Sequence, residues 1–421
     1  MRRSERTLVA VAAAITLALL LTLLVVGWRT GDDGGGGLTA GSGPASPSVP
    51  AARSLPPSDS SGSPPASSTT SDGADDDHDG GDGDGNGDDE DGEDEDRDPV
   101  NEVGVEVGAV AGTDGLPAVE EVTCPRDGVR VATADQLTEA LAEAERGTAI
   151  LLEDGRYEGA FVATASGTQD EPVWLCGGRD AVLDGGGVTK GYVLHLDGAD
   201  HWRLVGFSVQ NGQKGVMADG TVGSVVQGLA VEQIGDEAIH LRGHSTDNLV
   251  IGNQVSRTGL RRDKFGEGVY IGSAVSNWCT ITDCLPDRSD RNVVAHNVFL
   301  HTTSEAIDVK EGTVGGLLLG NTFDGAATTA ADSWVDVKGT AWLVEGNRGT
   351  STPLDGFQTH QILDRWGERN VFRRNVIESG PTRDEDGDPG HGIALRPEAG
   401  NVVRCDNTVT GGITLSNVPC T

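Results

Sequence analysis

A six-residue pattern recurs in the second half of the chain and restricts the possible folds more than any other feature. Its third and fifth positions are mostly Ile, Val or Leu, whereas its fourth and sixth positions are mostly polar. Such alternation predicts a short strand with one buried face and one solvated face. The copies start 22 to 38 residues apart, which is the spacing of a solenoid with one copy in each coil. They occupy residues 237–242, 267–272, 305–310, 333–338, 355–360 and 391–396.

Each repeat also contains a second apolar run with a recurrent Asn. Examples end at Asn253, Asn297, Asn321, Asn347 and Asn375. Asn at a fixed turn can adopt the left-handed backbone conformation, and its amide can stack in a hydrogen-bonded ladder. A leucine-rich repeat also has a recurrent Asn, but it needs an L-x-x-L-x-L spacing, which is absent. The repeats therefore predict an all-β fold, a single-stranded right-handed parallel β-helix, over residues 120–421.

One helix is expected before the strands. Residues 133–146 have an N-cap residue and helical periodicity. Short strands punctuated by Gly follow at residues 149–152, 155–157, 173–176 and 181–184. Because the first coil of a solenoid would otherwise expose an apolar end, this helix is expected to serve as its N-terminal cap.

The N-terminus indicates export. Residues 8–28 form an apolar run long enough to span a bilayer, and the arginines before it keep residues 1–7 cytoplasmic. The run has no good small-x-small cleavage site near its end, which favours a transmembrane anchor over a cleaved signal peptide. We expect a single-pass membrane protein with an extracellular C-terminal domain, or a secreted protein if the segment is cleaved. Six cysteines fit that location and are expected to pair as Cys124–Cys176, Cys279–Cys284 and Cys405–Cys420.

Residues 29–119 are expected to form a disordered linker. The first part is rich in Gly, Ser and Pro, and the stretch from Asp72 to Glu102 holds seventeen acidic residues and one Arg. Neither part can bury enough apolar surface to offset chain entropy. The net charge of the whole chain is -35, which excludes a nucleic-acid partner because phosphate binding needs a cationic face.

Stacking the hexads as parallel strands places their polar residues in columns. The first positions bring together Glu237, Glu267 and Glu305, with neighbouring rungs about 4.8 Å apart. Carboxylates this close need a bound cation, a raised pKa or basic neighbours. We therefore expect calcium, held by Glu267, Glu305 and Asp308.

The outward columns of the same strands are rich in cationic and aromatic side chains. A groove of this kind beside carboxylates suits an acidic polysaccharide, although charged residues also commonly do no more than solvate a solenoid face. The expected substrate-binding residues are Arg242, Tyr270, His240, His360 and Arg396. An insertion at residues 273–291, with Trp278, is either a wall of this groove or a disulfide-closed edge that covers the sheet.

The pattern of residues 133–187 followed by the β-helix resembles the chondroitinase-B-type and alginate-lyase-type polysaccharide lyases of family six. Those enzymes have a strand of the form E-x-x-x-x-K, a downstream G-N-T and a basic residue on the next coil. Residues 305–310 (EAIDVK) match the first part and residues 320–322 (GNT) the second. The resemblance implies that Lys310 is the catalytic base, Lys338 its partner and Glu305 a calcium ligand. The chain departs from the pattern at Thr303, where the family has an acidic ligand, and at Lys338, where it usually has Arg.

Three functions fit these observations. The first is a lyase that removes a proton from a uronate sugar and expels the 4-linked sugar by β-elimination, with calcium neutralising the carboxylate and a Lys of lowered pKa as the base. The second is a non-catalytic glycan-binding or adhesive β-helix, and the third is a uronate epimerase. In each case we expect a monomer that binds acidic polysaccharide and meets the membrane only through its N-terminal segment.

Overall fold

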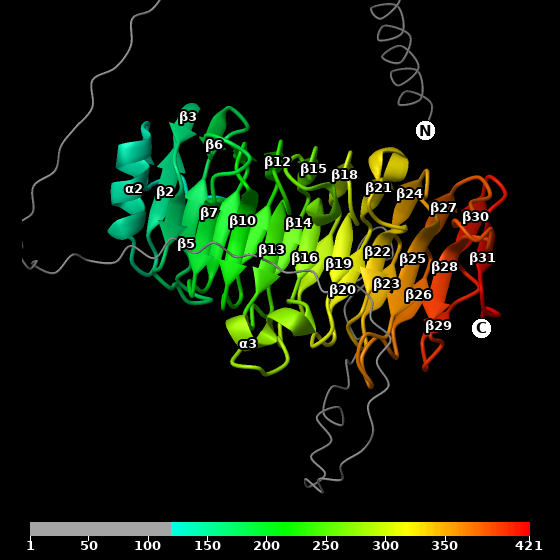
Figure 1. Ribbon diagram of the computed structural model, residues 1–421. Helices are drawn as coiled ribbons and strands as arrows, with labels where there is room; N and C mark the ends of the chain where they lie inside the picture. Colours follow the sequence, from blue (N-terminus) through cyan, green and yellow to red (C-terminus); the bar gives the residue numbers. More distant parts are fainter. Residues whose placement is uncertain (1–118) are drawn as a thin grey trace, which may run out of the picture. The chain divides into compact units, whose positions relative to one another are not determined.

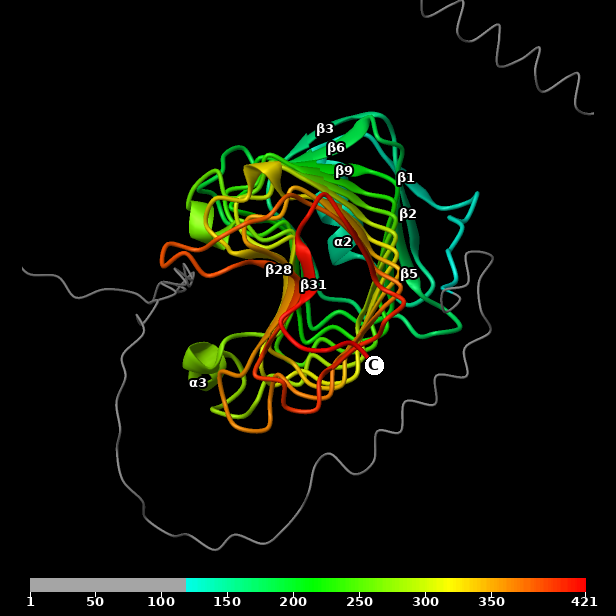
Figure 2. The same ribbon diagram turned by 90° about the vertical axis from the view of Figure 1, so that its right-hand side faces the viewer.

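The computed structural model describes residues 119–421, and the predicted cytoplasmic tail, membrane segment and linker lie outside the described residues. These residues form a parallel β-solenoid of three sheets, which enclose one hydrophobic core (Figures 1 and 2). The all-β parallel solenoid is confirmed, and the right-handedness of its coil stays a prediction. Within residues 119–421, no helix is both long and apolar enough to cross a membrane.

Sheet 1 has eleven strands, which contain the apolar runs before the recurrent Asn. In spatial order they are β1 (Val129–Val131), β2 (Ala149–Leu152), β5 (Val173–Cys176), β8 (Trp202–Val205), β11 (Val225–Gln227), β14 (Leu249–Ile251), β17 (Val293–Ala295), β20 (Leu317–Leu319), β23 (Leu343–Glu345), β26 (Val371–Arg373) and β29 (Val402–Val403).

Sheet 2 has ten strands that follow the Asn corner, and its later strands were not foreseen from the sequence. In spatial order they are β3 (Gly155–Glu158), β6 (Ala181–Asp184), β9 (Ser208–Gln210), β12 (Ala230–Glu232), β15 (Gln254–Ser256), β18 (Val298–Leu300), β21 (Thr322–Asp324), β24 (Arg348–Thr350), β27 (Val376–Glu378) and β30 (Thr408–Thr410). Three-residue strands are too short to give a readable alternation, which explains the omission.

Sheet 3 has ten strands and contains all six hexads. In spatial order they are β4 (Phe161–Ala163), β7 (Tyr192–Asp197), β10 (Lys214–Asp219), β13 (Ile239–Arg242), β16 (Val269–Ile271), β19 (Ile307–Val309), β22 (Ser333–Val337), β25 (Asp355–His360), β28 (His391–Arg396) and β31 (Thr414–Ser416). The third and fifth hexad positions face the core, as predicted, because their side chains are fully or almost fully buried in nearly every copy.

The predicted N-terminal helix is present as α2 (Ala134–Ala142). The side chain of Thr133 caps it by accepting a hydrogen bond from the backbone N–H of Gln136. Its buried residues are Leu137, Ala140 and Leu141, which join the same core as the strands. The helix lies at the N-terminal end of the coil (Figure 1) and, viewed along the coil, within its outline (Figure 2).

A ladder of buried Asn side chains runs along the corner between sheets 1 and 2. Each Asn except the last donates from Nδ2 to the Oδ1 of the Asn in the next coil at 2.9–3.0 Å. Its members are Asn253, Asn297, Asn321, Asn347, Asn375 and Asn407. The ladder confirms the predicted stacking. The predicted left-handed conformation falls instead on the preceding residue, such as His296 (φ 56°) or Arg374 (φ 54°), because the Asn itself turns inward to bond.

Replacing Asn321 by Ala is expected to lower the free energy of unfolding by about 3 kcal/mol, because several buried polar groups lose their partners at once. The Oδ1 of Asn321 accepts hydrogen bonds from the backbone N–H and the Nδ2 of Asn297. Its Nδ2 donates to the carbonyl of Val294 and to the Oδ1 of Asn347. Denaturant unfolding followed by circular dichroism measures the loss. The matched control is Thr322→Ala, because Thr322 is exposed and adjacent. Equal stability of the two variants would contradict the structural role of the ladder.

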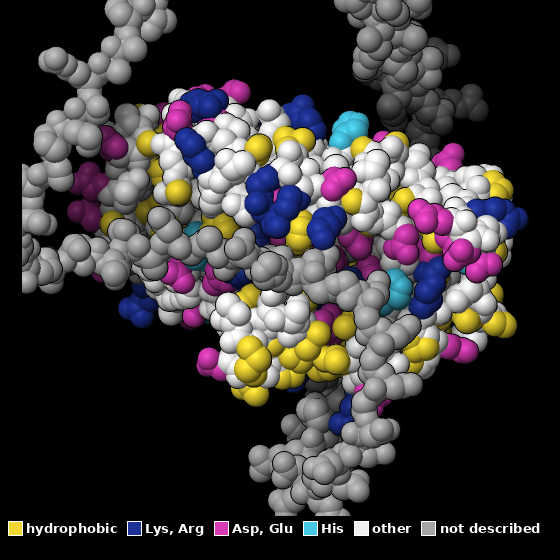
Figure 3. Space-filling view, in the orientation of Figure 1, with side chains coloured by type: hydrophobic (Ala, Val, Ile, Leu, Met, Phe, Trp, Pro, Cys, Tyr) yellow, Lys and Arg dark blue, Asp and Glu magenta, His cyan; other side chains and the backbone are white. Residues whose placement is uncertain are grey.

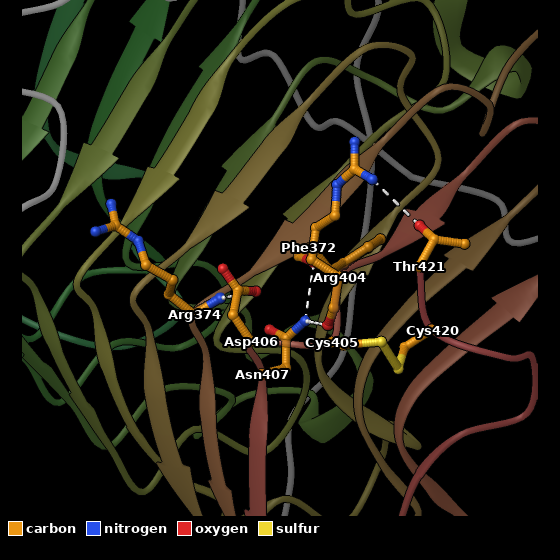
Figure 4. Close-up of a disulfide and its surroundings, with 8 residues drawn as sticks. All are labelled: Phe372, Arg374, Arg404, Cys405, Asp406, Asn407, Cys420 and Thr421. Carbon is orange, nitrogen blue, oxygen red and sulfur yellow. Dashed lines mark hydrogen bonds between the residues drawn. A yellow bond between two sulfur atoms is a disulfide. The ribbon is translucent and has the colours of Figure 1, made fainter.

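The three predicted disulfides are all formed, as Cys124–Cys176, Cys279–Cys284 and Cys405–Cys420. Figure 4 shows the last of them holding the C-terminal residues against the final coil, where Nη1 of Arg404 also donates to Oγ1 of Thr421 at 3.2 Å. Three disulfides indicate that this domain matures in an oxidising compartment outside the cytoplasm.

Candidate active site

The register of sheet 3 brings the predicted columns together. Ile239, Val269 and Ile307 are aligned on β13, β16 and β19, which aligns the glutamates two residues before each of them. In the next polar row, His240 pairs with Tyr270 and Tyr270 with Asp308. A pocket of ≈ 350 Å³ lies over these strands. Of the predicted site residues, it is lined by Arg242, His240, Tyr270, Glu267, Glu305, Asp308, Lys310 and Lys338.

Two segments that flank β16 in the sequence wall the pocket. One contains η1 (Asp263–Phe265), whose Lys264 and Phe265 line it. The other is the predicted insertion, with η2 (Val275–Asn277) and α3 (Trp278–Ile281), which lines the pocket through residues such as Ser276 and Asn277. The insertion is therefore a wall of the site. Figure 3 shows hydrophobic side chains gathered on its outer surface, near the position of α3 in Figure 1.

A buried carboxylate that the sequence did not reveal attaches this insertion to the coil. Asp287 accepts hydrogen bonds from the backbone N–H groups of Gly243 and His244, both at 2.9 Å. It also accepts from the hydroxyls of Ser273 and Ser289. Trp278 packs inside the insertion, where it is buried and its Nε1 donates to the carbonyl of Ser273 at 2.9 Å.

Glu267, Glu305 and Asp308 form the predicted acidic cluster. One carboxylate oxygen from each lies within 4.8 Å of the others. Burial, reinforced by the neighbouring carboxylates, raises the pKa of Glu267 well above its usual range, and burial together with Asp308 raises the pKa of Glu305. The Oε2 atom of Glu267 is buried and has no hydrogen-bond partner among the described residues. An oxygen-only donor set with an unpartnered buried oxygen fits a hard divalent cation such as calcium.

Two lysines on adjacent rungs share one carboxylate beside this cluster. The Nζ of Lys310 lies 2.8 Å from Oδ2 of Asp308, and the Nζ of Lys338 lies 3.0 Å from Oδ1 of the same group. Lys338 also lies 3.0 Å from Asp336. Burial by itself lowers the pKa of each lysine, but the negative charge of Asp308 and its neighbours outweighs burial and raises it. The expected lowered pKa of the base is therefore not present in this state of the site.

Tyr270 and His240 occupy the floor of the pocket. Burial, together with Asp308, raises the pKa of Tyr270 well above its usual range, so its hydroxyl keeps its proton. The Nζ of Lys310 lies 4.9 Å from the centroid of the Tyr270 ring. His240 packs edge-on against this ring, with centroids 4.5 Å apart, and its Nε2 lies 3.0 Å from the carbonyl of Gly272. Burial lowers the pKa of His240 well below its usual value, so the imidazole is neutral and holds Tyr270 in place.

The remaining predicted substrate-binding residues lie at different distances from this centre. Arg242 lines the pocket, and its Nε donates to Asp219 at 2.7 Å. Asp219, which also bonds His195 at 2.8 Å, was missed from the sequence because its strand lies upstream of the hexads considered. His360 and Arg396 do not line the pocket; they lie on β25 and β28, beyond Lys338.

Comparison with known proteins relates this pocket to a group of enzymes. The structure matches an alginate lyase from Paenibacillus sp. str. FPU-7 with 30% sequence identity and a TM-score of 0.63, over 69% of this chain and 98% of that chain. The chain belongs to the β-helical polysaccharide lyases. The resemblance expected from the sequence is therefore confirmed at the level of the family, and the individual roles of Lys310, Lys338 and Glu305 stay predictions.

One more distant match shares the fold of this polysaccharide lyase, and another aligns more weakly. Pectate lyase Pel9A has 11% identity and a TM-score of 0.52, over 70% of this chain and 80% of that chain. A PL6-family alginate lyase, AlyGC, has 14% identity and a TM-score of 0.38, over 64% of this chain and 43% of that chain. No protein-family model and no curated protein matches the chain.

Proposed function

We propose that this polysaccharide lyase is an exported enzyme that cleaves an acidic polysaccharide by β-elimination at the pocket over β16 and β19. The observation that carries the proposal is the meeting of Lys310, Tyr270 and the acidic cluster in one pocket of a chain 30% identical to an alginate lyase. We further propose that residues 8–28 anchor the enzyme in the membrane and that residues 29–119 link the anchor to the solenoid.

The elimination needs a base, an acid and positive charge beside the uronate carboxylate. Lys310, as the free amine, takes the proton from C5 of the uronate. The electron pair of that C–H bond becomes the C4–C5 double bond, and the bond from C4 to the bridging oxygen breaks. Tyr270 gives its proton to that oxygen, because it lines the pocket and its raised pKa keeps the hydroxyl protonated. Lys338 and Arg242, which remain charged, face the carboxylate.

The acidic cluster is proposed to hold calcium through Glu267, Glu305 and Asp308. A bound divalent cation would neutralise the sugar carboxylate. It would also offset the negative charge of Asp308 and Glu305, which raises the pKa of Lys310. Lys310 would then release its proton at a lower pH. Lys310 can then act as a base although it forms an ion pair with Asp308 in the structure.

The purified chain is expected to produce unsaturated uronate ends from at least one of alginate, pectate and chondroitin. Ultraviolet absorbance of the new double bond follows the reaction, with calcium or with a chelator present. Altered uronate composition without chain cleavage would indicate an epimerase instead of a lyase. Binding without chemical change would indicate a glycan-binding protein. No effect on any of these glycans would overturn the substrate class.

A further inference from the structure

Three cationic side chains follow one another along sheet 3, starting at Lys338 in the pocket and continuing beyond it. Lys338 comes directly after β22, His360 ends β25 and Arg396 ends β28. Val337 pairs with Thr359, and His360 pairs with Arg396, so the three occupy the same row on adjacent strands. Neighbouring strands are about 4.8 Å apart, a distance close to the advance of an extended 1,4-linked chain per sugar.

The charges in this row form two layers. Asp336 lies under Lys338 and His360, at 3.0 Å from Nζ and 2.9 Å from Nδ1, and Asp355 lies under Arg396, at 2.6 Å from Nη1. The two carboxylates are at most 3% exposed, whereas the side chains of His360 and Arg396 are 32% and 36% exposed. A strongly acidic protein therefore presents positive charge to solvent along this row.

Each cation keeps a donor that no described protein group uses. The Nζ of Lys338 has three donors and two carboxylate partners. His360 bonds through Nδ1, which leaves Nε2 on the opposite edge of the ring. The Nη1 of Arg396 donates a hydrogen bond to Gln358 and forms an ion pair with Asp355, which leaves Nε and Nη2. The buried carboxylates fix these groups in place, so that an anion meets donors that are already oriented.

We propose that His360 and Arg396, which continue the row of Lys338 away from the pocket, form an extended subsite that binds the carboxylates of uronate sugars beyond the one undergoing elimination. This proposal rests on the proposed function. The subsite makes the enzyme more efficient on long polysaccharide chains, which cover β25 and β28, than on short oligosaccharides that fill only the pocket.

The subsite is also expected to weaken as the pH rises. The groups that face His360 are Asp336 from β22, Lys338 directly after it, Asp332 before it, and Arg396 from β28. Burial lowers the pKa of His360, but Asp336 outweighs it and the net shift is upward. The ring is therefore charged below this raised pKa and donates from Nε2, and it loses its charge as the pH rises through it.

The test compares the ratio of kcat/KM on a long and a short oligosaccharide of the glycan that the wild type cleaves. The double variant His360→Gln/Arg396→Gln should lower this ratio about tenfold or more, since two charged contacts to the long chain are lost. His360→Gln alone should also remove the fall of the ratio at high pH. If the double variant unfolds, Arg396→Lys serves in its place, because it keeps a charge over Asp355. It should still lower the ratio, since lysine lacks the Nε and Nη2 donors of arginine. Arg348→Gln is the matched control, because Arg348 is exposed on sheet 2.

A ratio unchanged in the variants, or lowered equally by the control, overturns the subsite while the lyase function stands. If the wild type cleaves no acidic glycan, the proposed function fails and the subsite is judged by binding alone. Calorimetric titration of a long uronate oligosaccharide should then show about tenfold weaker binding by the double variant. Equal affinity of the two proteins, or no binding to either, would overturn the subsite as well.

Discussion

The Lys310→Met variant is expected to lose about 10³-fold or more in kcat on the accepted glycan, because removal of a positioned general base costs this much. Lys310→Arg is the more informative change. Arginine preserves the charge beside Asp308, which Lys310 contacts at 2.8 Å, but it does not deprotonate in proteins. It should therefore retain the fold and substrate binding while its kcat falls as far as that of the methionine variant.

The control for Lys310 is Lys190→Met, since Lys190 is exposed, does not line the pocket and precedes β7, which lies four strands away from β19. This control should have the wild-type rate. Thermal unfolding of all variants separates a loss of chemistry from a loss of structure. If Lys310→Arg retained more than a tenth of the wild-type kcat, Lys310 would act as a fixed cation, and another group would have to take the proton.

Calcium is expected to move the acidic limb of the pH profile of kcat/KM to lower pH. Without a cation, Asp308 and Glu305 raise the pKa of Lys310 and keep it protonated. On the acidic limb, each unit by which that pKa falls makes about ten times more free amine available at a given pH. A chelator should therefore reduce activity near neutral pH about 100-fold, and added calcium should restore it.

Glu267→Gln and Glu305→Gln should each abolish this shift, because they remove a charged oxygen from the cluster. They should also abolish the rise in melting temperature with calcium, which is a readout independent of activity. Asp384→Asn, in the exposed acidic loop at residues 382–389, controls for diffuse cation binding and should leave both effects intact. If calcium did not move the pH profile, the negative charge of the acidic cluster would be balanced by protons and lysines alone.

Periodicity in the sequence was sufficient to predict the coil, the hexad strands and the rows of the site. This worked because each coil repeats the same pattern, so the contact between Tyr270 and Asp308 follows from their equal positions in two hexads. Two of the three disulfides followed from proximity in the sequence, because Cys279–Cys284 and Cys405–Cys420 are 5 and 15 residues apart, whereas Cys124 and Cys176 are 52 residues apart. The comparisons then confirmed the family.

Features outside the repeat were harder to predict. Trp278 lies in an insertion, so no register indicates that its ring packs inward, and Asp287 binds groups that are more than forty residues away in the sequence. The charge state of Lys310 depends on the balance between burial and several carboxylates, which residue types alone do not give. The absence of His360 and Arg396 from the pocket reflects where the flanking insertions lie, not the repeat itself.

The position of the site along the solenoid determines the order in which structure and activity are lost on unfolding. Each strand of sheet 3 pairs only with its two neighbours, so the coils behave as a one-dimensional array in which opening starts at an end and propagates. Helix α2 protects one end and the Cys405–Cys420 disulfide the other. Lys310 lies near the middle of the array. Heat or proteolysis must therefore unravel several coils from either end before the catalytic rung is disturbed, and loss of terminal structure should precede loss of activity.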